Sequence, residues 1–387
     1  EISACLVGSE MYIRDNNNMA NLKVNLYGME FLNPIMTAAG PGAKDGALCQ
    51  EAAKGGAGAI CTKTISVLPA DVPRPCMAKT NSGFLNTELW SELPKEQWIE
   101  EEYKKVKETG LPVIVSMGYS AEQIAEVAPL VKPYADAVEL STHYVGTDVA
   151  PIVNALKAAK AVLDVPVFMK MSPHTDIQTI AKAVEEAGAD GLVMINSFGP
   201  CMAIDVNTGY PIMGSKAGYG WLSGAPIRPL AIRCIYEASQ VVNIPIIGVG
   251  GITCGKDVAE MMMAGASAVQ VCTEAILKGP SIYGKIAKEL NEFLDENGYA
   301  DVNEIKGLTH KKMAARGFRT HSVAPVVDDN KCIKCKQCVT SCVYEALEVT
   351  DKLNIDADKC FGCGLCVTRC PKGALSICYN QVEAMNE

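Results

Sequence analysis

The chain has 387 residues and a mass of 41.2 kDa, which is too long for one small domain and fits a β/α barrel with a small additional module. Its formal net charge is −9, which argues against nucleic acid as the main partner, since phosphate binding needs a basic face. No run of about 18 apolar residues occurs, so the sequence predicts no membrane span.

Eight short apolar segments alternate with helical stretches between residues 34 and 290. Most are continuous apolar runs, which are typical of parallel strands covered on both faces. Amphipathic helices are predicted between them, for example at 121–131, 176–187 and 255–264. Eight such units in sequence predict an α/β fold, a closed (β/α)8 TIM barrel. The predicted strands are 34–40, 57–64, 112–118, 137–143, 166–172, 191–197, 245–251 and 268–274.

Four parts are predicted along the chain. The first part, residues 1–18, does not begin with Met and lacks the apolar core of a secretory signal, so we interpret it as a leader or an added segment. Within the barrel, residues 22–33 predict a hairpin that closes the bottom, and the glycine-rich insertion 199–226 predicts a lid. A polar connector and a cysteine-rich module follow. The predicted boundaries are 1–18, 19–295, 296–328 and 329–387.

Eight of the 17 cysteines form two motifs of the pattern C-x2-C-x2-C-x3-C. In such a pair, three thiolates of one motif hold a [4Fe–4S] cluster, and its fourth ligand comes from the other motif. The spacing therefore predicts a C-terminal ferredoxin-like module with two [4Fe–4S] clusters. One cluster is expected on Cys332, Cys335, Cys338 and Cys370, and the other on Cys342, Cys360, Cys363 and Cys366.

Zinc is the alternative ligand for cysteine-rich motifs, but zinc sites use two ligand pairs at wider separation rather than two quartets. The remaining nine cysteines are scattered, and we expect most of them to be small core residues. Thiols that stay free or hold metal are typical of a reducing compartment, which predicts a cytoplasmic location.

The active sites of β/α barrels lie at the C-terminal ends of the strands. The last two predicted strands end in Gly250, Gly251 and Thr273, whose backbone and hydroxyl donors suit a phosphate group. Lys170 lies within an apolar strand, so its ammonium needs a nearby anion or carbonyl group. The pyrimidine edge of a flavin would satisfy it, and a core carboxylate is the alternative. Lys63 has a similar placement.

These motifs resemble those of the dihydroorotate dehydrogenase-like flavoprotein family. They are most similar to its pyrimidine-reducing branch, the FMN and iron–sulfur portion of dihydropyrimidine dehydrogenase, which in bacteria is a separate catalytic subunit. The matching segments are Thr62-Lys63-Thr64, Phe84-Leu85-Asn86, Gly188-Ala189-Asp190-Gly191, Asn196-Ser197, Leu222-Ser223-Gly224, Gly250-Gly251-Ile252 and Gln270-Val271-Cys272. The resemblance implies FMN bound by Ala39, Gly40, Lys63, Thr64, Lys170, Gly224, Gly250, Gly251, Cys272 and Thr273. It also implies Asn86, Asn196 and Ser197 as substrate contacts.

The chain departs from this family at the end of the fourth strand. There the family has an Asn-x-Ser-Cys-Pro motif, whose Asn binds the pyrimidine and whose Cys exchanges a proton. We match Glu139 to that Asn and Thr142 to that Cys. Because a hydroxyl is a much weaker acid than a thiol, His143 and Tyr144 are the better general-acid candidates. The alternatives are a His143 satisfied by a backbone carbonyl and a Glu139 paired with Lys170 or Lys63.

We therefore expect an oxidoreductase acting on CH–CH bonds, which reduces or reversibly oxidises an activated C=C bond of a small cyclic or carbonyl-conjugated substrate. Electrons would pass through the two clusters to FMN, and an acid from residues 142–144 would protonate the substrate carbon. No Gly-x-Gly-x-x-Gly motif opens a Rossmann unit. The electron donor is thus expected to be a separate protein, an NAD(P)H-dependent flavoprotein subunit or a ferredoxin, and we expect a homo- or hetero-oligomer.

Two alternative functions remain open. The first is a dihydropyrimidine dehydrogenase catalytic subunit that acts on uracil or thymine with altered site residues. The second is an electron-transfer subunit without its own substrate, which predicts a filled pocket over the flavin. A role on nucleic acid, as in the tRNA dihydrouridine synthases, is disfavoured by the acidic balance and the lack of a basic module.

Overall fold

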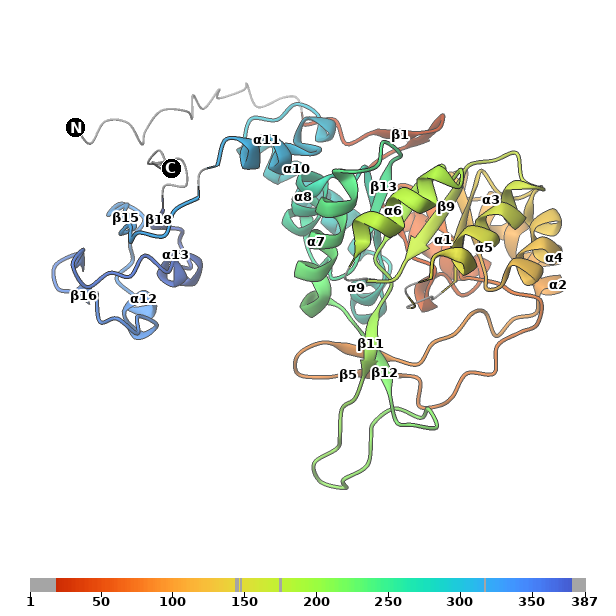
Figure 1. Cartoon of the computed structure of the whole chain (residues 1–387), viewed down its shortest axis with the longest axis horizontal. Helices are drawn as coiled ribbons and strands as arrows, with labels where there is room; N and C mark the ends of the chain where they lie inside the picture. The colour runs from red at the N-terminus through yellow and green to blue at the C-terminus, as the bar shows by residue number, and fades with distance from the viewer. Residues whose placement is uncertain (1–18, 143–145, 147, 174–175, 317, 378–387) are drawn as a thin grey trace. The chain divides into compact units, whose positions relative to one another are not determined.

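The structure is a computed structural model that describes residues 19–142, 146, 148–173, 176–316 and 318–377. Contacts between Cα atoms divide the chain into two compact units, one ending at His310 and one beginning at Lys311. Figure 1 shows the first unit in red to cyan and the second in blue. Among the described residues, no helix has the length and apolar character needed to span a bilayer.

Eight parallel strands form the barrel of the first unit, which confirms the predicted fold class. Their hydrogen-bonded order is β3-β14-β13-β10-β9-β8-β7-β4, and a parallel bridge between Met36 and Ala59 joins the first strand to the last. All eight lie inside the predicted segments. They are β3 (Ile35–Thr37), β4 (Ile60–Cys61), β7 (Val113–Met117), β8 (Ala137–Ser141), β9 (Val167–Met171), β10 (Gly191–Met194), β13 (Ile246–Val249) and β14 (Ala268–Val271).

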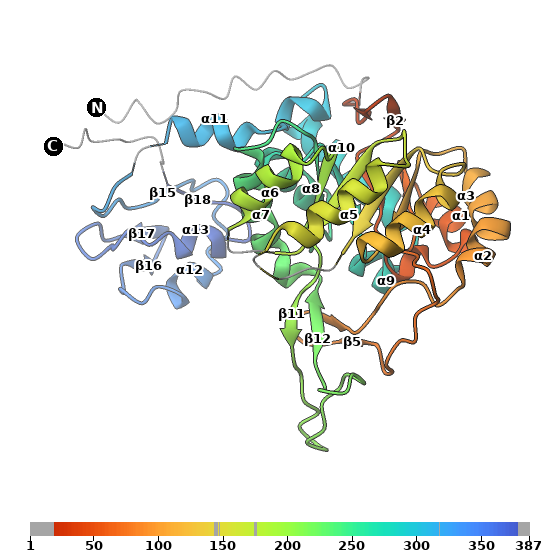
Figure 2. The same cartoon turned by 45° about the vertical axis from the view of Figure 1, so that its right-hand side comes forward.

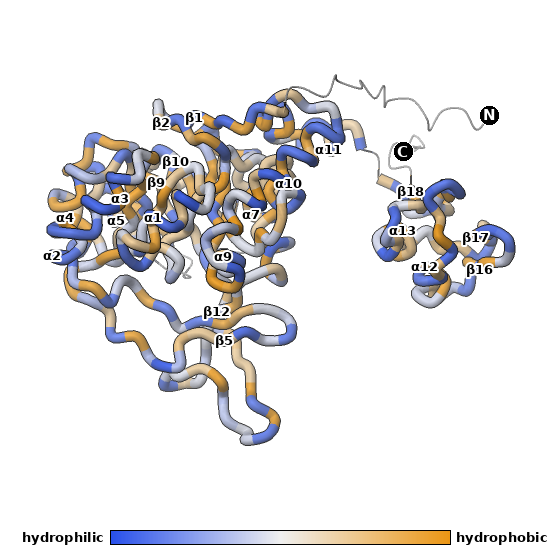
Figure 3. The backbone as a smooth tube through the Cα atoms, turned by 180° about the vertical axis from the view of Figure 1, so that it is seen from behind, coloured by the Kyte–Doolittle hydropathy of each residue, from blue (hydrophilic) through white to orange (hydrophobic). Residues whose placement is uncertain are grey.

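Every residue of these eight strands is buried, because side chains on one face fill the barrel and those on the other face pack against the surrounding helices. Figure 3 shows hydrophobic and hydrophilic stretches alternating along those helices, as expected for amphipathic segments. The covering helices are α1 (Gly46–Lys54), α3 (Tyr103–Lys107), α4 (Ala121–Val131), α5 (Ala150–Lys160), α6 (Ile177–Glu186), α7 (Arg228–Ser239), α8 (Gly255–Ala264) and α10 (Ile282–Glu296).

Helix starts follow local capping chemistry. Asp45, Ser120 and Asp176 each accept a hydrogen bond from a backbone N–H of the first turn of α1, α4 and α6. Short helical turns complete the unit: η1 (Pro41–Ala43), α2 (Lys95–Gln97), η2 (Trp98–Glu102), η3 (Ala225–Ile227), α9 (Thr273–Lys278), η4 (Val302–Ile305) and α11 (Leu308–Ala314), which crosses the unit boundary.

The two ends of the barrel are different. At one end, β1 (Val24–Leu26) and β2 (Met29–Phe31) form the predicted antiparallel hairpin, and the Tyr27 ring lies 6.3 Å from that of Phe168 at the start of β9. At the other end, the predicted insertion supplies β11 (Phe198–Cys201) and β12 (Gly220–Ser223). These strands join β5 (Met77–Lys79) and β6 (Phe84–Asn86) in a four-stranded antiparallel sheet, which the sequence did not predict. Figures 1 and 2 both show this sheet projecting from the end opposite the hairpin.

The second unit is a small module with two short helices, α12 (Gln337–Thr340) and α13 (Leu365–Arg369), and two two-stranded sheets. In one sheet β15 (Val326–Val327) pairs with β18 (Leu375–Ser376), which ties the two ends of the module together. The other is the hairpin of β16 (Leu347–Val349) and β17 (Leu353–Ile355). Each helix directly follows a cysteine turn, so the two halves repeat one arrangement.

Candidate functional site

A deep cleft opens at the end of the barrel where the strands terminate, beneath the four-stranded sheet. Its volume is about 980 Å³ including the part open to solvent. The polar and charged residues that line it are Lys63, Thr64, Asn86, Glu88, Tyr119, Ser141, Lys170, Asn196, Ser197, Ser223, Gln270, Cys272 and Thr273. Glycines and apolar side chains complete the wall, among them Ala38, Ala39, Gly40, Gly224, Gly250 and Gly251.

Every residue that the resemblance assigned to FMN or to substrate lines this single cleft. The ten expected flavin contacts come from the ends of five strands and from the turn after β12, and the three expected substrate contacts come from β6 and from the turn after β10. The structure thus brings together residues that are up to 234 positions apart, from Ala39 to Thr273.

The floor of the cleft contains a buried ion pair between Lys170 and Glu139. The Lys170 Nζ lies 3.2 Å from Glu139 Oε1, and both side chains are almost fully buried. The Gln270 amide donates to Glu139 Oε2 at 2.6 Å, which fixes the carboxylate in place. Burial opposes the ammonium, but the Glu139 carboxylate outweighs it and raises the pKa of Lys170. Lys170 is therefore a firmly protonated cation facing the cleft.

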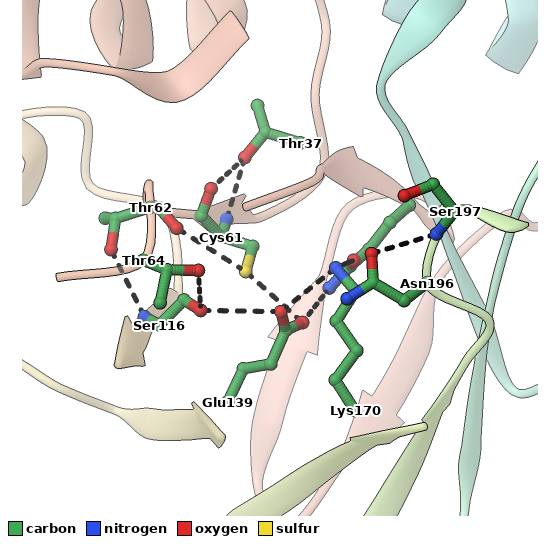
Figure 4. A network of polar contacts seen from close by, with 10 residues as sticks. Thr37, Cys61, Thr62, Thr64, Ser116, Glu139, Lys170, Asn196 and Ser197 are labelled. Carbon is green, nitrogen blue, oxygen red and sulfur yellow. Dashed lines mark hydrogen bonds and ion pairs between the residues drawn. The ribbon is translucent and has the colours of Figure 1, made fainter. Parts of the chain in front are cut away.

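Side chains from other strands extend this network, as Figure 4 shows. The Ser116 hydroxyl lies 3.5 Å from Glu139 Oε1 and 2.9 Å from the Thr64 hydroxyl. The Cys61 thiol lies 3.5 Å from Glu139 Oε2, and burial together with this carboxylate raises the pKa of the thiol well above its ordinary value. Because side chains from five strands meet at one carboxylate, Glu139 must point into the barrel.

A second ion pair lies in the wall of the cleft. The Lys63 Nζ is 2.7 Å from Glu88 Oε2, and both side chains are largely buried. The Glu88 backbone N–H donates to the side chain of Asn86, so the pair is held beside an expected substrate contact. Sequence reasoning missed Glu88, because it lies after β6 in a segment with no barrel periodicity. Only its two-residue distance from Asn86 could have drawn attention to it.

Glycines shape the side of the cleft formed by the last two strands. Gly224, Gly250 and Gly251 all have a positive φ, at 81°, 126° and 80°. A Cβ on Gly40 would lie 2.6 Å from the Cys272 sulfur, so only glycine fits there without a shift. The Thr273 hydroxyl donates to Ser223 at 3.0 Å. Backbone N–H groups can therefore approach a planar, phosphate-bearing group closely, with Lys170 facing it from the floor.

The residues expected to act at the end of the fourth strand differ in whether they reach the cleft. Glu139 is fully buried below the floor and is not part of the cleft lining, whereas Ser141, two residues later, lines the cleft. Thr142 is half-buried and is also not part of the lining. His143 and Tyr144 lie outside the described residues. The ion-pair alternative for Glu139 is the one seen here, so this residue acts on the cleft only through Lys170, Gln270 and Ser116.

The module holds two separate cavities, each lined by four cysteines. The first is lined by Cys332, Cys335, Cys338 and Cys370, and the second by Cys342, Cys360, Cys363 and Cys366. These are the two sets expected from the spacing, including the exchange of the fourth ligand. Among the described residues, no three cysteine, histidine or carboxylate ligands are grouped closely enough to hold a single metal ion.

Backbone geometry around these cavities suits thiolate ligands. Burial disfavours the Cys370 thiolate, but the backbone N–H groups of Ala374, Lys372, Leu375 and Gly373 outweigh it and lower the pKa of the thiol. The Ala374 N–H donates to the Cys370 sulfur at 3.2 Å. Such bonds stabilise cluster-bound sulfur, and the eight cysteines fit two iron–sulfur clusters.

Comparison with known proteins identifies both parts of the chain. A family model described as dihydroorotate dehydrogenase matches residues 21–294, and one described as 4Fe-4S dicluster domain matches residues 331–374. One similar protein is the catalytic subunit of dihydroorotate dehydrogenase B (NAD(+)) from Methanothermobacter thermautotrophicus, 37% identical over 302 residues, 75% of this chain and 98% of that protein.

Proteins of the same name from Methanosarcina mazei and Pyrococcus furiosus are 39% and 36% identical over 305 residues, and cover 75% of this chain. The matches take in 96% and 99% of those proteins. These relatives are named for dihydroorotate, not for dihydropyrimidines, so the finer likeness to the pyrimidine-reducing branch is not established by them. The chain belongs to the dihydroorotate dehydrogenase family, whose members are FMN-dependent oxidoreductases acting on CH–CH bonds, and it combines that barrel with a 4Fe-4S dicluster domain.

Proposed function

We propose that this protein reduces, or reversibly oxidises, an activated C=C bond in a small uncharged cyclic amide or conjugated carbonyl compound. Electrons would be relayed through two [4Fe–4S] clusters and FMN. The main support is the cleft at the strand ends, where the expected flavin and substrate contacts lie together around a cationic floor. The two cysteine-lined cavities supply the ligands for an electron relay in the same chain.

The charge of the cleft supports an uncharged substrate. Lys63 would attract a substrate carboxylate such as that of dihydroorotate, but Glu88 already neutralises it at 2.7 Å. Lys170 is likewise neutralised by Glu139 from below. The described residues that line the cleft therefore include no unpaired cation that could bind a substrate carboxylate. An uncharged ring loses little solvation free energy on entering such a site.

The chain's own residues would divide the work as follows. The Lys170 ammonium, held by Glu139 and Gln270, would bind the flavin and favour negative charge on it when it is reduced. The amides of Asn86 and Asn196 and the hydroxyl of Ser197 can hydrogen-bond the carbonyl and N–H groups of a ring. When bound, FMN supplies hydride transfer and one-electron exchange. Proton exchange at the neighbouring carbon is assigned to the segment 142–144.

A dihydropyrimidine dehydrogenase subunit is the second candidate, because uracil and thymine are uncharged cyclic amides and fit the same charge argument. An electron-transfer subunit without a substrate is less well supported, since Asn86, Asn196 and Ser197, the expected substrate contacts, line the same cleft as the expected flavin contacts. Dihydroorotate, the substrate in the relatives' name, is disfavoured by the Lys63–Glu88 pair.

The test is anaerobic purification followed by a substrate screen. The reduced protein is mixed with cyclic enones, cyclic amides, uracil, thymine and orotate, and flavin reoxidation is followed by absorbance. We expect reoxidation by at least one uncharged compound, with a product that has gained two hydrogens. An Asn196→Ala variant should keep its flavin and iron but lose turnover by about 10- to 100-fold.

Two results would contradict the proposal. One is a protein that, prepared without air, contains neither FMN nor about eight irons per chain. The other is a flavin that orotate reoxidises while every uncharged compound fails.

A further inference from the structure

The two cysteine-lined cavities of the module differ in the charge of their rims. The first is lined by Lys334 and Lys336 in addition to its four cysteines, while no charged residue lines the second in the part of the chain that the structure describes. Both lysines are exposed, and neither forms an ion pair among the described residues. The first cavity thus has two free cations at its edge.

Lys334 and Lys336 both have a backbone conformation that usually favours glycine. Lys334 and Lys336 have φ values of 56° and 61°, and the matching positions of the second motif are Gly362 and Gly364, at 74° and 78°. The left-handed region favours glycine, because a side chain there is crowded by the backbone. Glycine would therefore serve the turn better at both positions of the first motif. The chain has lysine instead, which indicates a use for the two side chains.

An apolar side chain lies between the two charges. Ile333 lines the first cavity with 57% of its surface exposed, and Cys335 beside it is exposed as well. Lys372 directly follows Pro371, which lines this cavity, and is also exposed. Of the two acidic residues just before this turn, Asp328 pairs with Lys331 at 3.3 Å, and Asp329 is exposed. Residues 328–377 contain seven basic and seven acidic residues, so the positive charge of this face is a local feature of the module.

We propose that this face is the docking surface for a small acidic one-electron carrier protein of the ferredoxin or flavodoxin class. The inference rests on the proposed function and adds to it the point at which electrons enter. An exposed apolar centre with positive charges around it suits a small, transient, electrostatically steered interface. We name it the lysine rim: Ile333, Lys334, Lys336 and Lys372.

The second cavity has a different neighbour. Its lining includes Pro325, and a Cβ on Gly362 would lie 2.8 Å from the backbone nitrogen of Val323. The segment through which the chain enters the module therefore lies against the turn of the second motif, whereas Lys334 and Lys336 line the first cavity. Each reduced carrier is oxidised by one electron at the first cluster. Two such transfers, together with two protons, reduce one C=C bond to CH–CH.

The experiment mixes the oxidised holoprotein with a reduced acidic ferredoxin in an anaerobic stopped-flow instrument. Bleaching of the clusters gives the second-order rate constant without reference to any substrate. At low ionic strength, the double variant Lys334→Glu with Lys336→Glu should lower this rate constant by about tenfold or more. Added salt should slow the unaltered protein and reduce the difference between the two, since screening removes the steering.

A matched control changes the same charge on another exposed surface. Lys285→Glu with Lys288→Glu, on α10, should leave the rate constant within about twofold. A second double variant, Lys334→Asn with Lys336→Asn, removes both charges with a residue that tolerates the left-handed backbone. It tests the role of the charges if the glutamate variant loses iron.

Equal rates for the unaltered protein and both lysine variants would overturn the docking proposal, and so would a rate that salt does not change. Failure of the proposed function is distinguishable from either result. In that case the carrier still bleaches the clusters at a rate that depends on the lysine rim, but no uncharged compound reoxidises the flavin.

Discussion

The barrel and the module bury apolar side chains to very different extents. The barrel core contains dozens of fully buried residues, including large ones such as Phe31, Trp98 and Tyr283. The buried cluster of the module has only four members, Cys338, Leu347, Leu353 and Leu375, and one of these is an expected metal ligand. The barrel is therefore stabilised by hydrophobic burial, which increases with the size of a domain.

A unit as small as the module needs another source of stability, and metal–thiolate bonds are the usual one. Four of its cysteines, Cys332, Cys342, Cys366 and Cys370, are among the partly buried residues packed against this small core. We therefore expect the barrel to keep its fold without its cofactor and the fold of the module to depend on its clusters.

Removing cluster ligands should unfold the module and spare the barrel. For Cys338→Ser we expect loss of about four irons per chain and rapid amide hydrogen exchange across 326–377. The barrel should keep its unfolding midpoint, because its core contains none of the affected ligands. Hydrogen exchange with mass spectrometry measures both parts at once.

Cys254→Ser is the control, since this half-buried cysteine lies in the barrel, outside both quartets. A module that keeps native exchange protection after iron removal would break the comparison.

Substitution of the Glu139–Lys170 pair tests whether the stability of the barrel depends on a buried ion pair as well as on hydrophobic burial. Glu139→Gln leaves a buried ammonium without its counter-charge, and we expect a loss of about 3 kcal/mol of stability by denaturant unfolding. The exposed substitution Glu122→Gln on α4 should cost almost nothing.

This effect should depend on pH in one direction. Glu139 raises the pKa of Lys170 above its ordinary value of 10.5, so the pair stabilises the fold fully below that pH. The contribution is lost as the pH rises through the higher folded-state pKa. The stability difference between the unaltered protein and Glu139→Gln should thus be constant near neutrality and shrink in strong alkali. A difference that stays unchanged in strong alkali would contradict this assignment.

Steric fit in the wall of the cleft predicts a smaller effect. Gly40→Ala places a Cβ about 2.6 Å from the Cys272 sulfur, and we expect a cost of about 1–3 kcal/mol with weaker FMN retention. Adding Cys272→Ala removes the sulfur and should restore most of the loss. Gly42→Ala, whose Cβ would be 3.9 Å from the Tyr283 hydroxyl, is the matched control. Absence of rescue in the double variant would show that the close contact is not the cause.

The smallest expected effect concerns substrate charge. Glu88→Gln frees Lys63, so an anionic compound such as orotate should gain about tenfold in kcat/KM relative to an uncharged ring, about 1.4 kcal/mol. Glu92→Gln alters a nearby glutamate that does not line the cleft and should leave the ratio unchanged. An unchanged ratio in Glu88→Gln as well would remove the argument for an uncharged substrate.

Local spacing explains why much of this architecture could be predicted from the sequence. The eight barrel strands lie inside the predicted segments, because each is a short apolar run between turn residues. The cysteine sets were predicted for the same reason, since three of each four ligands lie within seven residues. The helices at 121–131 and 255–264 begin and end where the periodicity predicted.

Long-range pairing explains what the sequence did not reveal. The sheet of β5, β6, β11 and β12 joins two loops more than 100 residues apart, and no local pattern marks that partnership. Glu139 was predicted as a residue at the substrate, because strand alternation alone does not tell how deep a residue lies below the mouth. The Lys63–Glu88 pair depends on how the loop after β6 returns over the barrel.

The four-stranded sheet holds one expected substrate contact, Asn86, apart from the barrel strands. Asn86 pairs with Trp221 and Met77 across strands that share no hydrogen-bonded ladder with the barrel. Relatives or engineered versions could exchange these two loops for others and thereby acquire new reactants while the eight barrel strands stay as they are. Loop grafting at β5–β6 and β11–β12 is thus a practical route to altered selectivity in this scaffold.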